Sequence, residues 1–202
     1  MASERRLSRA GFLLAGGRSS RMGVDKAFLP FQGRPLVEHA ISLMQRACSP
    51  VTIVGDPAKF SSYGPVVADI FAGCGPLAGI HAGLNSSSAE LNLFMAVDMP
   101  FVSAELLLFL LRIAEQTDGQ VVVPHTARGL QPLCAVYRRS FATVAERLLS
   151  TGKYKIDAAF AGLPIRVVEE AELRVAGFSE QNFFNLNTPA DVQQAERSGK
   201  PA

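Results

Sequence analysis

The segment AGFLLAGGRSSRMGVDK, residues 10–26, sets the architecture of the whole chain. Its first six residues are apolar, which is typical of a buried β-strand, and the adjacent glycines that follow suit a tight turn. Glycine lets the backbone come close to a ligand, and successive N–H groups in such a loop point toward anionic oxygens. We therefore predict a phosphate-binding loop over residues 14–26, at the carboxyl end of the first strand, where ligands bind in open α/β sheets.

Two familiar phosphate loops do not match this segment. The dinucleotide fingerprint G-x-G-x-x-G is excluded because Gly16 and Gly17 are adjacent, and a P-loop is excluded because Gly23 is followed by Val-Asp-Lys. Arg21 and Lys26 add positive charge, arginine as a bidentate phosphate ligand and lysine as a point charge. A glycine turn with solvated arginines is the simpler alternative, and a triphosphate-binding loop is favoured over it.

Apolar runs and helical periods alternate along the rest of the chain. Buried strands are expected at residues 10–15, 51–54, 66–67, 91–97, 121–123, 133–137 and 165–168, and helices at residues 35–47, 76–85, 104–115, 141–149 and 189–196. Ser103 and Thr188 suit helix N-caps, and Asp191 completes a capping box. The alternation predicts an α/β fold: a single Rossmann-like three-layer domain with a mostly parallel sheet, allowing one antiparallel strand in the less regular second half.

Composition bounds the class of protein. The 202 residues are 48% hydrophobic and 19% charged, which is typical of a globular protein, and we expect one domain over residues 1–202. The net charge of +2 argues against nucleic-acid binding through a general basic surface. Residues 1–9 are expected to be a flexible lead-in, as chain termini often are. A signal peptide is the competing interpretation, and the apolar stretch after the arginines, interrupted by Gly11, is too short for one. No window approaches the ~20 apolar residues of a membrane span. The three cysteines lack metal-site spacing, which favours reduced thiols in a cytoplasm.

Carboxylates follow two of the expected strands. Asp98 ends the most apolar strand, beside the predicted phosphate loop, and magnesium prefers one or two carboxylates together with phosphate oxygens. Asp98 is therefore the predicted Mg²⁺ ligand; a helix-capping role suits it less, because Ser103 is the better cap. Asp69 is expected at a similar level of the sheet, in contact with nucleotide or metal. Asp25 could orient Lys26, bind metal through water or be an ordinary loop acid. The histidines occur singly, which is more typical of packing or surface positions than of catalysis.

With these residues in view, the chain closely resembles the molybdenum cofactor guanylyltransferases of the MobA-like nucleotidyltransferase family. The matching blocks are LAGGRSSRMGVDKAFLPFQGRPLVEH (14–39), GPLAGIHAGL (75–84), AVDMPFV (96–102) and NLNTPADV (185–192). They span nearly the whole chain in the family's order. The resemblance implies a Rossmann-like fold and transfer of GMP from GTP to molybdenum-molybdopterin, giving molybdopterin guanine dinucleotide and pyrophosphate.

The resemblance also implies roles for individual residues. Nucleotide contacts would come from Leu14, Ala15, Gly16, Gly17, Lys26, Asp69 and Asp98. Asp98 would also hold Mg²⁺, with Lys26 and Arg21 stabilising the charge on the phosphates. Asn185 and Asn187 would face the pterin.

One departure and two rival functions remain open at this point. Gly55 stands where some relatives have an asparagine, so a base or ribose contact from that side chain is lost or replaced. The related cytidylyltransferases, which use CTP, tend toward LAAG in the first block and lack GPLAG, whereas this chain has Gly16-Gly17 and GPLAG at 75–79. A non-catalytic protein that delivers nucleotide or pterin is disfavoured by the retained Lys26 and Asp98. Molybdoenzyme apoproteins or their chaperones are the expected recipients of the product.

Overall fold

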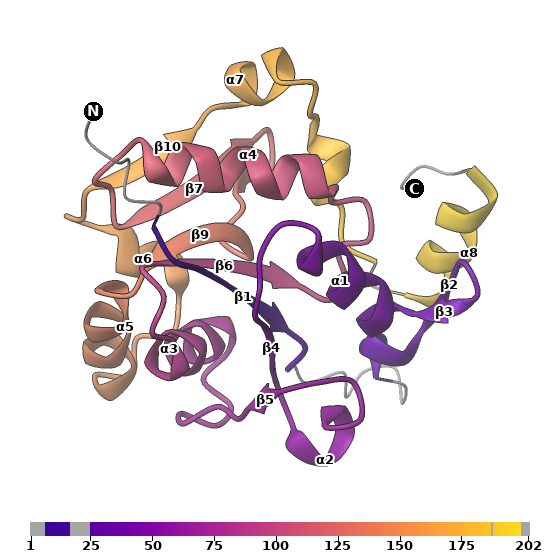
Figure 1. The fold of residues 1–202 in the computed structure, drawn as a ribbon, viewed down its shortest axis with the longest axis horizontal. Coiled ribbons are helices and arrows are strands. Elements are labelled where there is room, and N and C mark those ends of the chain that lie inside the picture. Colours follow the sequence, from indigo (N-terminus) through magenta and orange to yellow (C-terminus); the bar gives the residue numbers. More distant parts are fainter. Residues whose placement is uncertain (1–6, 17–24, 187, 199–202) are drawn as a thin grey trace.

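A twisted, mostly parallel β-sheet forms the centre of the computed structural model, which describes residues 7–16, 25–186 and 188–198 (Figure 1). The strand order is β10-β7-β9-β6-β1-β4-β5, with β8 paired to β7. The strands are β1 (Arg9–Leu14), β4 (Val51–Val54), β5 (Val66–Val67), β6 (Leu91–Ala96), β7 (Val121–Thr126), β8 (Gly129–Leu130), β9 (Cys134–Arg138) and β10 (Ile165–Val168). Along the main path only β9 runs antiparallel to its neighbours. The predicted α/β fold is confirmed; the second half contains two antiparallel strands, β9 and the short β8, where one was allowed for.

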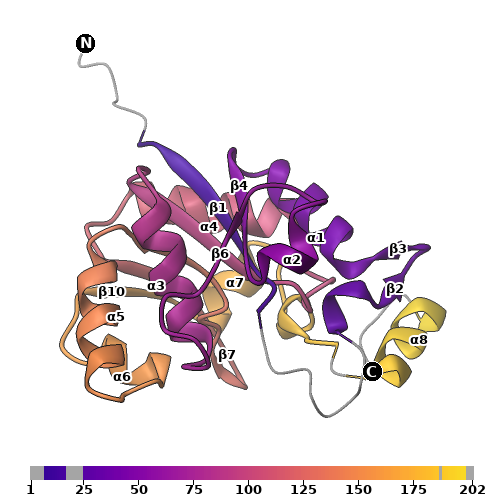
Figure 2. The same ribbon diagram turned by 90° about the horizontal axis from the view of Figure 1, so that it is seen from below.

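Helices cover both faces of the sheet and make a three-layer structure (Figures 1 and 2). Helices α1 (Leu36–Gln45) and α4 (Ala104–Glu115) pack on one face, and α3 (Pro76–Ser86), α5 (Phe141–Ser150) and α6 (Ile156–Phe160) pack on the other. Strand β6 contributes side chains to the hydrophobic cores on both faces of the sheet. Leu93 and Met95 point into the first core and Phe94 into the second, because successive side chains of a strand alternate between faces.

The predicted capping residues act as expected. Ser103 Oγ accepts a hydrogen bond from Leu106 N at 3.2 Å and starts α4. Thr188 and Asp191 form the reciprocal capping box of α8 (Pro189–Ser198), at 2.8 and 3.1 Å. Pro35, however, is the N-cap of α1 rather than its first residue.

Several short elements were not expected from the sequence. They are η1 (Lys26–Phe28), the hairpin β2 (Pro30–Phe31) and β3 (Arg34–Pro35), α2 (Pro57–Phe60), α6, β8, α7 (Glu170–Val175) and η2 (Glu180–Phe183). Elements of two to six residues are too short to display a hydrophobic period, so tertiary contacts decide them. The hairpin illustrates this, since it packs beside α8 and Gln32 N donates to Glu196 Oε1 at 2.7 Å.

The amino-terminal strand begins one residue earlier than expected. Arg9, which we assigned to the lead-in, already belongs to β1, and its guanidinium donates to Glu115 Oε1 of α4 at 2.7 Å. Residues 1–6 lie outside the described residues.

Helix α3 approaches the sheet closely at Gly83. A Cβ at this position would lie 2.8 Å from Phe94 Cε1 and 2.9 Å from Phe12 Cδ1, in a stacked pair of rings. We expect Gly83→Ala to lower the free energy of unfolding by about 1–3 kcal/mol, because a buried aromatic pair has no room to move aside. Urea denaturation measures this. Helix propensity alone would make the same substitution stabilising by about 1 kcal/mol, so a gain in stability would contradict the close packing.

Candidate active site

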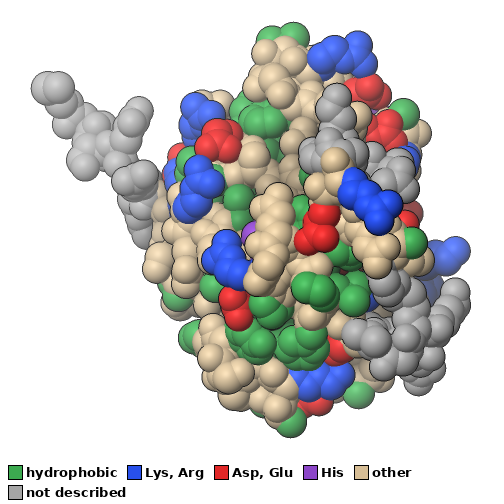
Figure 3. Space-filling view, turned by 90° about the vertical axis from the view of Figure 1, so that its right-hand side faces the viewer, with side chains coloured by type: hydrophobic (Ala, Val, Ile, Leu, Met, Phe, Trp, Pro, Cys, Tyr) green, Lys and Arg blue, Asp and Glu red, His purple; other side chains and the backbone are tan. Residues whose placement is uncertain are grey.

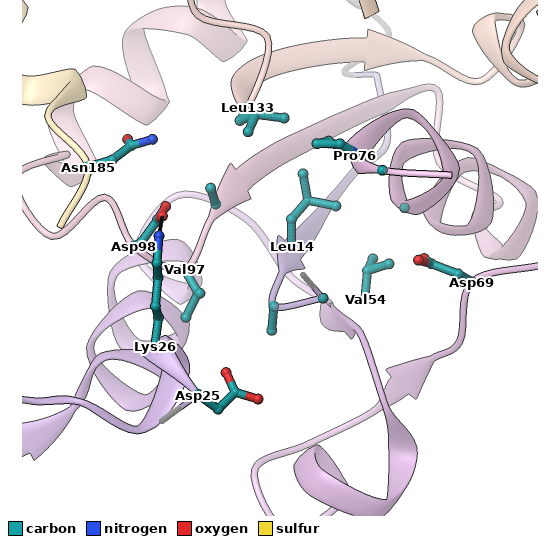
Figure 4. A pocket seen from close by; sticks show the side chains of 15 residues that line it. Leu14, Asp25, Lys26, Val54, Asp69, Pro76, Val97, Asp98, Leu133 and Asn185 are labelled. Atoms are coloured by element: carbon teal, nitrogen blue, oxygen red, sulfur yellow. Dashed lines mark hydrogen bonds and ion pairs between the residues drawn. The ribbon is translucent and has the colours of Figure 1, made fainter. Parts of the chain in front are cut away.

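A cleft opens at the carboxyl edge of the sheet, over the ends of β1, β4, β5 and β6 (Figure 4). Seven of the predicted site residues line it: Leu14, Ala15, Gly16, Lys26, Asp69, Asp98 and Asn185. Three others, Gly17, Arg21 and Asn187, lie outside the described residues. Leu14, Asp69 and Asp98 meet in one cleft, as expected where parallel strands end at the same edge, and Asn185 joins them from the segment after η2 (Glu180–Phe183).

The backbone at the end of β1 leads directly into the cleft. Ala15 N and Gly16 N both donate to Val54 O, at 2.9 and 3.1 Å, and Val97 N donates to Leu14 O at 3.1 Å. The start of the glycine-rich loop is therefore held between the neighbouring strands β4 and β6. A ligand in the cleft would meet main chain at Gly16 rather than a bulky side chain.

Lys26 and Asp98 form an ion pair across the floor of the cleft. Lys26 Nζ lies 3.5 Å from Asp98 Oδ2, and the two side chains are 27% and 17% exposed. Burial raises the pKa of the Asp98 carboxyl, and the ammonium of Lys26 lowers it in part. The raised pKa means that Lys26 does not fully offset the cost of the buried charge. A bound cation would favour the ionised carboxylate further.

Asp69 lies across the cleft from Asp98, with Leu14 between them (Figure 4). Burial raises the pKa of Asp69. A Cβ at Gly79 would lie 3.0 Å from Leu14 Cδ2 and 3.6 Å from Asp69 Oδ1, so the glycine leaves space beside both side chains. Asp69 is thus placed to contact a ligand lying against Leu14. Its place on the opposite wall separates it from the metal site predicted at Asp98.

Helix α3 starts at the rim of the cleft. Its N-cap, Gly75, has φ of 76°, a conformation that favours glycine, and Pro76 occupies the first turn without needing to donate a backbone hydrogen bond. Both residues line the cleft. The N-terminal end of a helix favours anions, which suits a site for phosphates.

A carboxyl-terminal segment closes the Asp98 side of the cleft. Leu186 N donates to the backbone oxygen of Asp98 at 2.8 Å, and Asn182 Nδ2 donates to Phe101 O at 3.1 Å. These bonds fix the segment to the loop that follows β6 and bring Asn185 to the cleft wall, on the side away from Asp69 (Figure 4). The cleft therefore has two sides, one at Asp69 and one at Asn185.

Close packing against Phe60 explains why glycine occupies position 55 in this chain. A Cβ there would lie 3.0 Å from Cδ2 and Cε2 of Phe60, a fully buried side chain of α2. An asparagine at this position would require Phe60 to move. The aromatic ring thus occupies the space that a side chain at position 55 would need.

Histidine does not line this cleft. The ring of His39 hydrogen-bonds Phe31 O at 2.6 Å, and the ring of His125 interacts with Glu169 at 3.0 Å. His81 is buried in α3, and burial lowers its pKa. All three side chains pack within the fold or lie at its surface.

Other residues of the cleft wall were not predicted from the sequence. Val54, Gly79 and Leu133 also line it. Gly79 lies within the GPLAG block, whose small residues are a signal of close approach, whereas the apolar Val54 and Leu133 carry no signal that separates them from core residues. Asp25, left ambiguous by its sequence context, lines the cleft and also caps η1, because its Oδ1 accepts from Ala27 N at 3.3 Å.

Comparison with known proteins identifies the family of this chain. Residues 11–170 match the MobA-like NTP transferase domain. A molybdenum cofactor guanylyltransferase from Desulfosudis oleivorans is 35% identical over 194 residues, covering 94% of this chain and 95% of that protein. A probable molybdenum cofactor guanylyltransferase from Pelotomaculum thermopropionicum is 36% identical over 192 residues, covering 94% and 92%.

A solved structure shows the same fold. The crystal structure of molybdopterin-guanine dinucleotide biosynthesis protein A from Archaeoglobus fulgidus superimposes with a TM-score of 0.81 at 29% identity. The match covers 93% of this chain and 97% of that one. Since the domain match spans most of the sequence and the relatives align over nearly their full length, this chain belongs to the MobA-like NTP transferase family.

Proposed function

We propose that this protein transfers GMP from GTP to molybdenum-molybdopterin, forming molybdopterin guanine dinucleotide and releasing pyrophosphate. The observation that carries the proposal is the Lys26–Asp98 pair, at 3.5 Å, in a cleft that Leu14, Ala15 and Gly16 also line. Relatives named molybdenum cofactor guanylyltransferase, aligned over nearly the whole chain, supply the substrate class.

The two sides of the cleft suit two substrates. We assign GTP to the side with Leu14, Gly79 and Asp69, where a glycine leaves room beside a carboxylate. The pterin would lie on the side of Asn185. Between these sides, Lys26 would neutralise phosphate charge at the reacting centre.

The reaction needs little covalent help from the protein. An oxygen of the pterin's terminal phosphate forms a bond to the α-phosphorus of GTP, the bond from that phosphorus to the bridging oxygen breaks, and pyrophosphate leaves. Such transfers depend on positioning and on stabilising charge in the transition state. A phosphate nucleophile is already ionised at neutral pH, so no general base is required. Arg21, Gly17 and Asn187 would add phosphate and pterin contacts; they lie outside the described residues.

We assign Asp98 as the ligand of a magnesium ion. Its carboxylate is largely buried and carries a raised pKa, and magnesium accepts one or two carboxylates when substrate phosphates complete its shell. Among the described residues no group of three or more His, Cys, Asp or Glu side chains forms a ready-made metal cage. This fits an ion that arrives with the nucleotide. When bound, Mg²⁺ would supply positive charge to the phosphates.

We place the reaction in the cytoplasm, with molybdoenzyme apoproteins or their chaperones as recipients of the product. All three cysteines are unpaired, as in a reducing compartment. In the described part of the chain no helix is long and apolar enough to cross a bilayer. Charges of both signs are interspersed on the face seen in Figure 3, which does not favour nucleic-acid binding there.

Calorimetric titration with GTP, CTP and ATP, each with Mg²⁺, tests the choice of nucleotide. We expect selective binding of GTP, because the chain has Gly16-Gly17 and GPLAG at 75–79. Tighter binding of CTP would instead assign the protein to the cytidylyltransferases. Pyrophosphate release from GTP in the presence of the pterin substrate then separates an enzyme from a delivery protein, which would bind without turnover.

A further inference from the structure

Asp25 has two partners, one on each carboxylate oxygen. Oδ1 accepts from Ala27 N at 3.3 Å and caps η1, the turn that carries Lys26. Oδ2 accepts from Lys59 Nζ at 2.8 Å. Lys59 belongs to α2, a four-residue helix outside the expected elements, and its side chain is half exposed. The end of the glycine-rich loop is thus tied to α2 through Asp25.

A second contact joins the same two elements. The ring of Phe28, the last residue of η1, stacks on the ring of Phe60 in α2 with centroids 5.4 Å apart and planes inclined by 18°. The ring centroid of Tyr63 lies 6.0 Å from that of Phe28. Gly55 leaves the space that Phe60 occupies. An aromatic stack and an ion pair therefore both join α2 to η1, the turn that carries Lys26.

The ion pair also changes the charge of the cleft. Asp25 lines the cleft beside Lys26, and its carboxylate faces the space between Lys26 and Asp69 (Figure 4). A triphosphate there would be repelled by an uncompensated carboxylate. Lys59 is not itself among the residues that line the cleft, so it acts through Asp25.

We infer that Lys59 is a positioning residue of the nucleotide site: it neutralises Asp25 and holds it as the cap of η1, so that the cleft accepts a triphosphate. This rests on the proposed function for the identity of the ligand. We therefore expect the effect of removing Lys59 to depend on the charge of Asp25.

Calorimetric titration of Mg·GTP into the full chain tests this directly and needs no pterin. Lys59→Met is expected to raise the Kd roughly three- to fivefold, the size of one partly exposed ion pair. Lys59→Arg should restore binding, because it keeps the charge. In the Asp25→Asn background the cap is retained but the carboxylate charge is gone. Lys59→Met should then change the Kd by less than about twofold, because no ion pair is left to lose.

Arg174→Met is the matched control. Arg174 forms a similar exposed ion pair with Glu170, also at 2.8 Å, in α7, which lies at the opposite end of the molecule from α2 (Figure 1). It should leave the Kd unchanged. An equal Kd for Lys59→Met and wild type, or an equally large effect of Lys59→Met in the Asp25→Asn background, would overturn the inference alone. Failure of the wild-type protein to bind any nucleoside triphosphate would overturn the proposed function and this inference with it.

Discussion

Asp98→Asn is expected to lower GMP transfer roughly a hundred- to a thousandfold, the range seen when one preorganised electrostatic group is removed. The amide has nearly the same shape as the carboxylate, but it carries no charge for Mg²⁺ or for Lys26, whose Nζ lies 3.5 Å away. Pyrophosphate release from GTP, with saturating Mg²⁺ and pterin substrate, measures the loss. Full Mg²⁺-dependent turnover of this variant would refute the assignment of Asp98.

The stability of the same variant separates a chemical effect from a folding defect. Burial raises the pKa of Asp98 in the folded protein, so the folded state holds its proton more tightly than the unfolded state does. The stability that Asp98 contributes at low pH is therefore lost as the pH rises through the folded-state pKa. Asparagine has no such dependence, and we expect the melting temperature of Asp98→Asn at neutral pH to equal or exceed that of the wild type. A lower melting temperature would assign part of the lost activity to misfolding.

Lys26→Ala is expected to weaken binding of Mg·GTP and to slow turnover, together by roughly a hundredfold in kcat/KM. The side chain supplies the positive charge beside Asp98 on the cleft floor. Its loss removes a partner of the phosphates and leaves a buried carboxylate without that ammonium. Titration calorimetry measures the binding and pyrophosphate release the turnover.

The pH dependence of Lys26→Ala provides a second measurement. Lys26 lowers the pKa of Asp98 in the wild type, against the raising effect of burial. Without Lys26 the pKa of Asp98 rises further, so the carboxylate becomes protonated at higher pH. We expect the acid limb of the activity profile to move to higher pH in Lys26→Ala, and Lys26→Arg, which keeps the charge, to resist this shift. An unchanged acid limb in Lys26→Ala would contradict electrostatic coupling between the two residues.

Periodicity in the sequence predicted the long elements well. Helix α4 has the predicted bounds and begins after the predicted cap Ser103, and the fully buried β6 ends one residue before its predicted end. These elements bury continuous apolar runs or wide apolar faces, and local sequence records such burial. Helix α2 and η1 have no such apolar run, and each is held instead by contacts with other segments, such as the stack of Phe60 on Phe28.

The site was predicted where a functional group is chemically distinctive. Lys26, Asp69 and Asp98 line one cleft, as expected for residues after strands that end at one edge. The pairing of Asp25 with Lys59 could not be predicted, since no sequence period relates a loop acid to a lysine 34 positions later. The position of Asn185 depends on a similar long-range contact, the bond from Leu186 N to Asp98 O.

The sequence by itself determined the α/β class, the glycine-rich turn after the first strand and the two strand-end carboxylates, because these follow from local burial, backbone freedom and charge. Only the tertiary structure decided how those groups are arranged. It placed Asp69 and Asp98 on opposite walls, paired Asp98 with Lys26 and filled the space beside Gly55 with Phe60. These relations arise from packing between segments distant in the chain, and a local pattern does not record such packing.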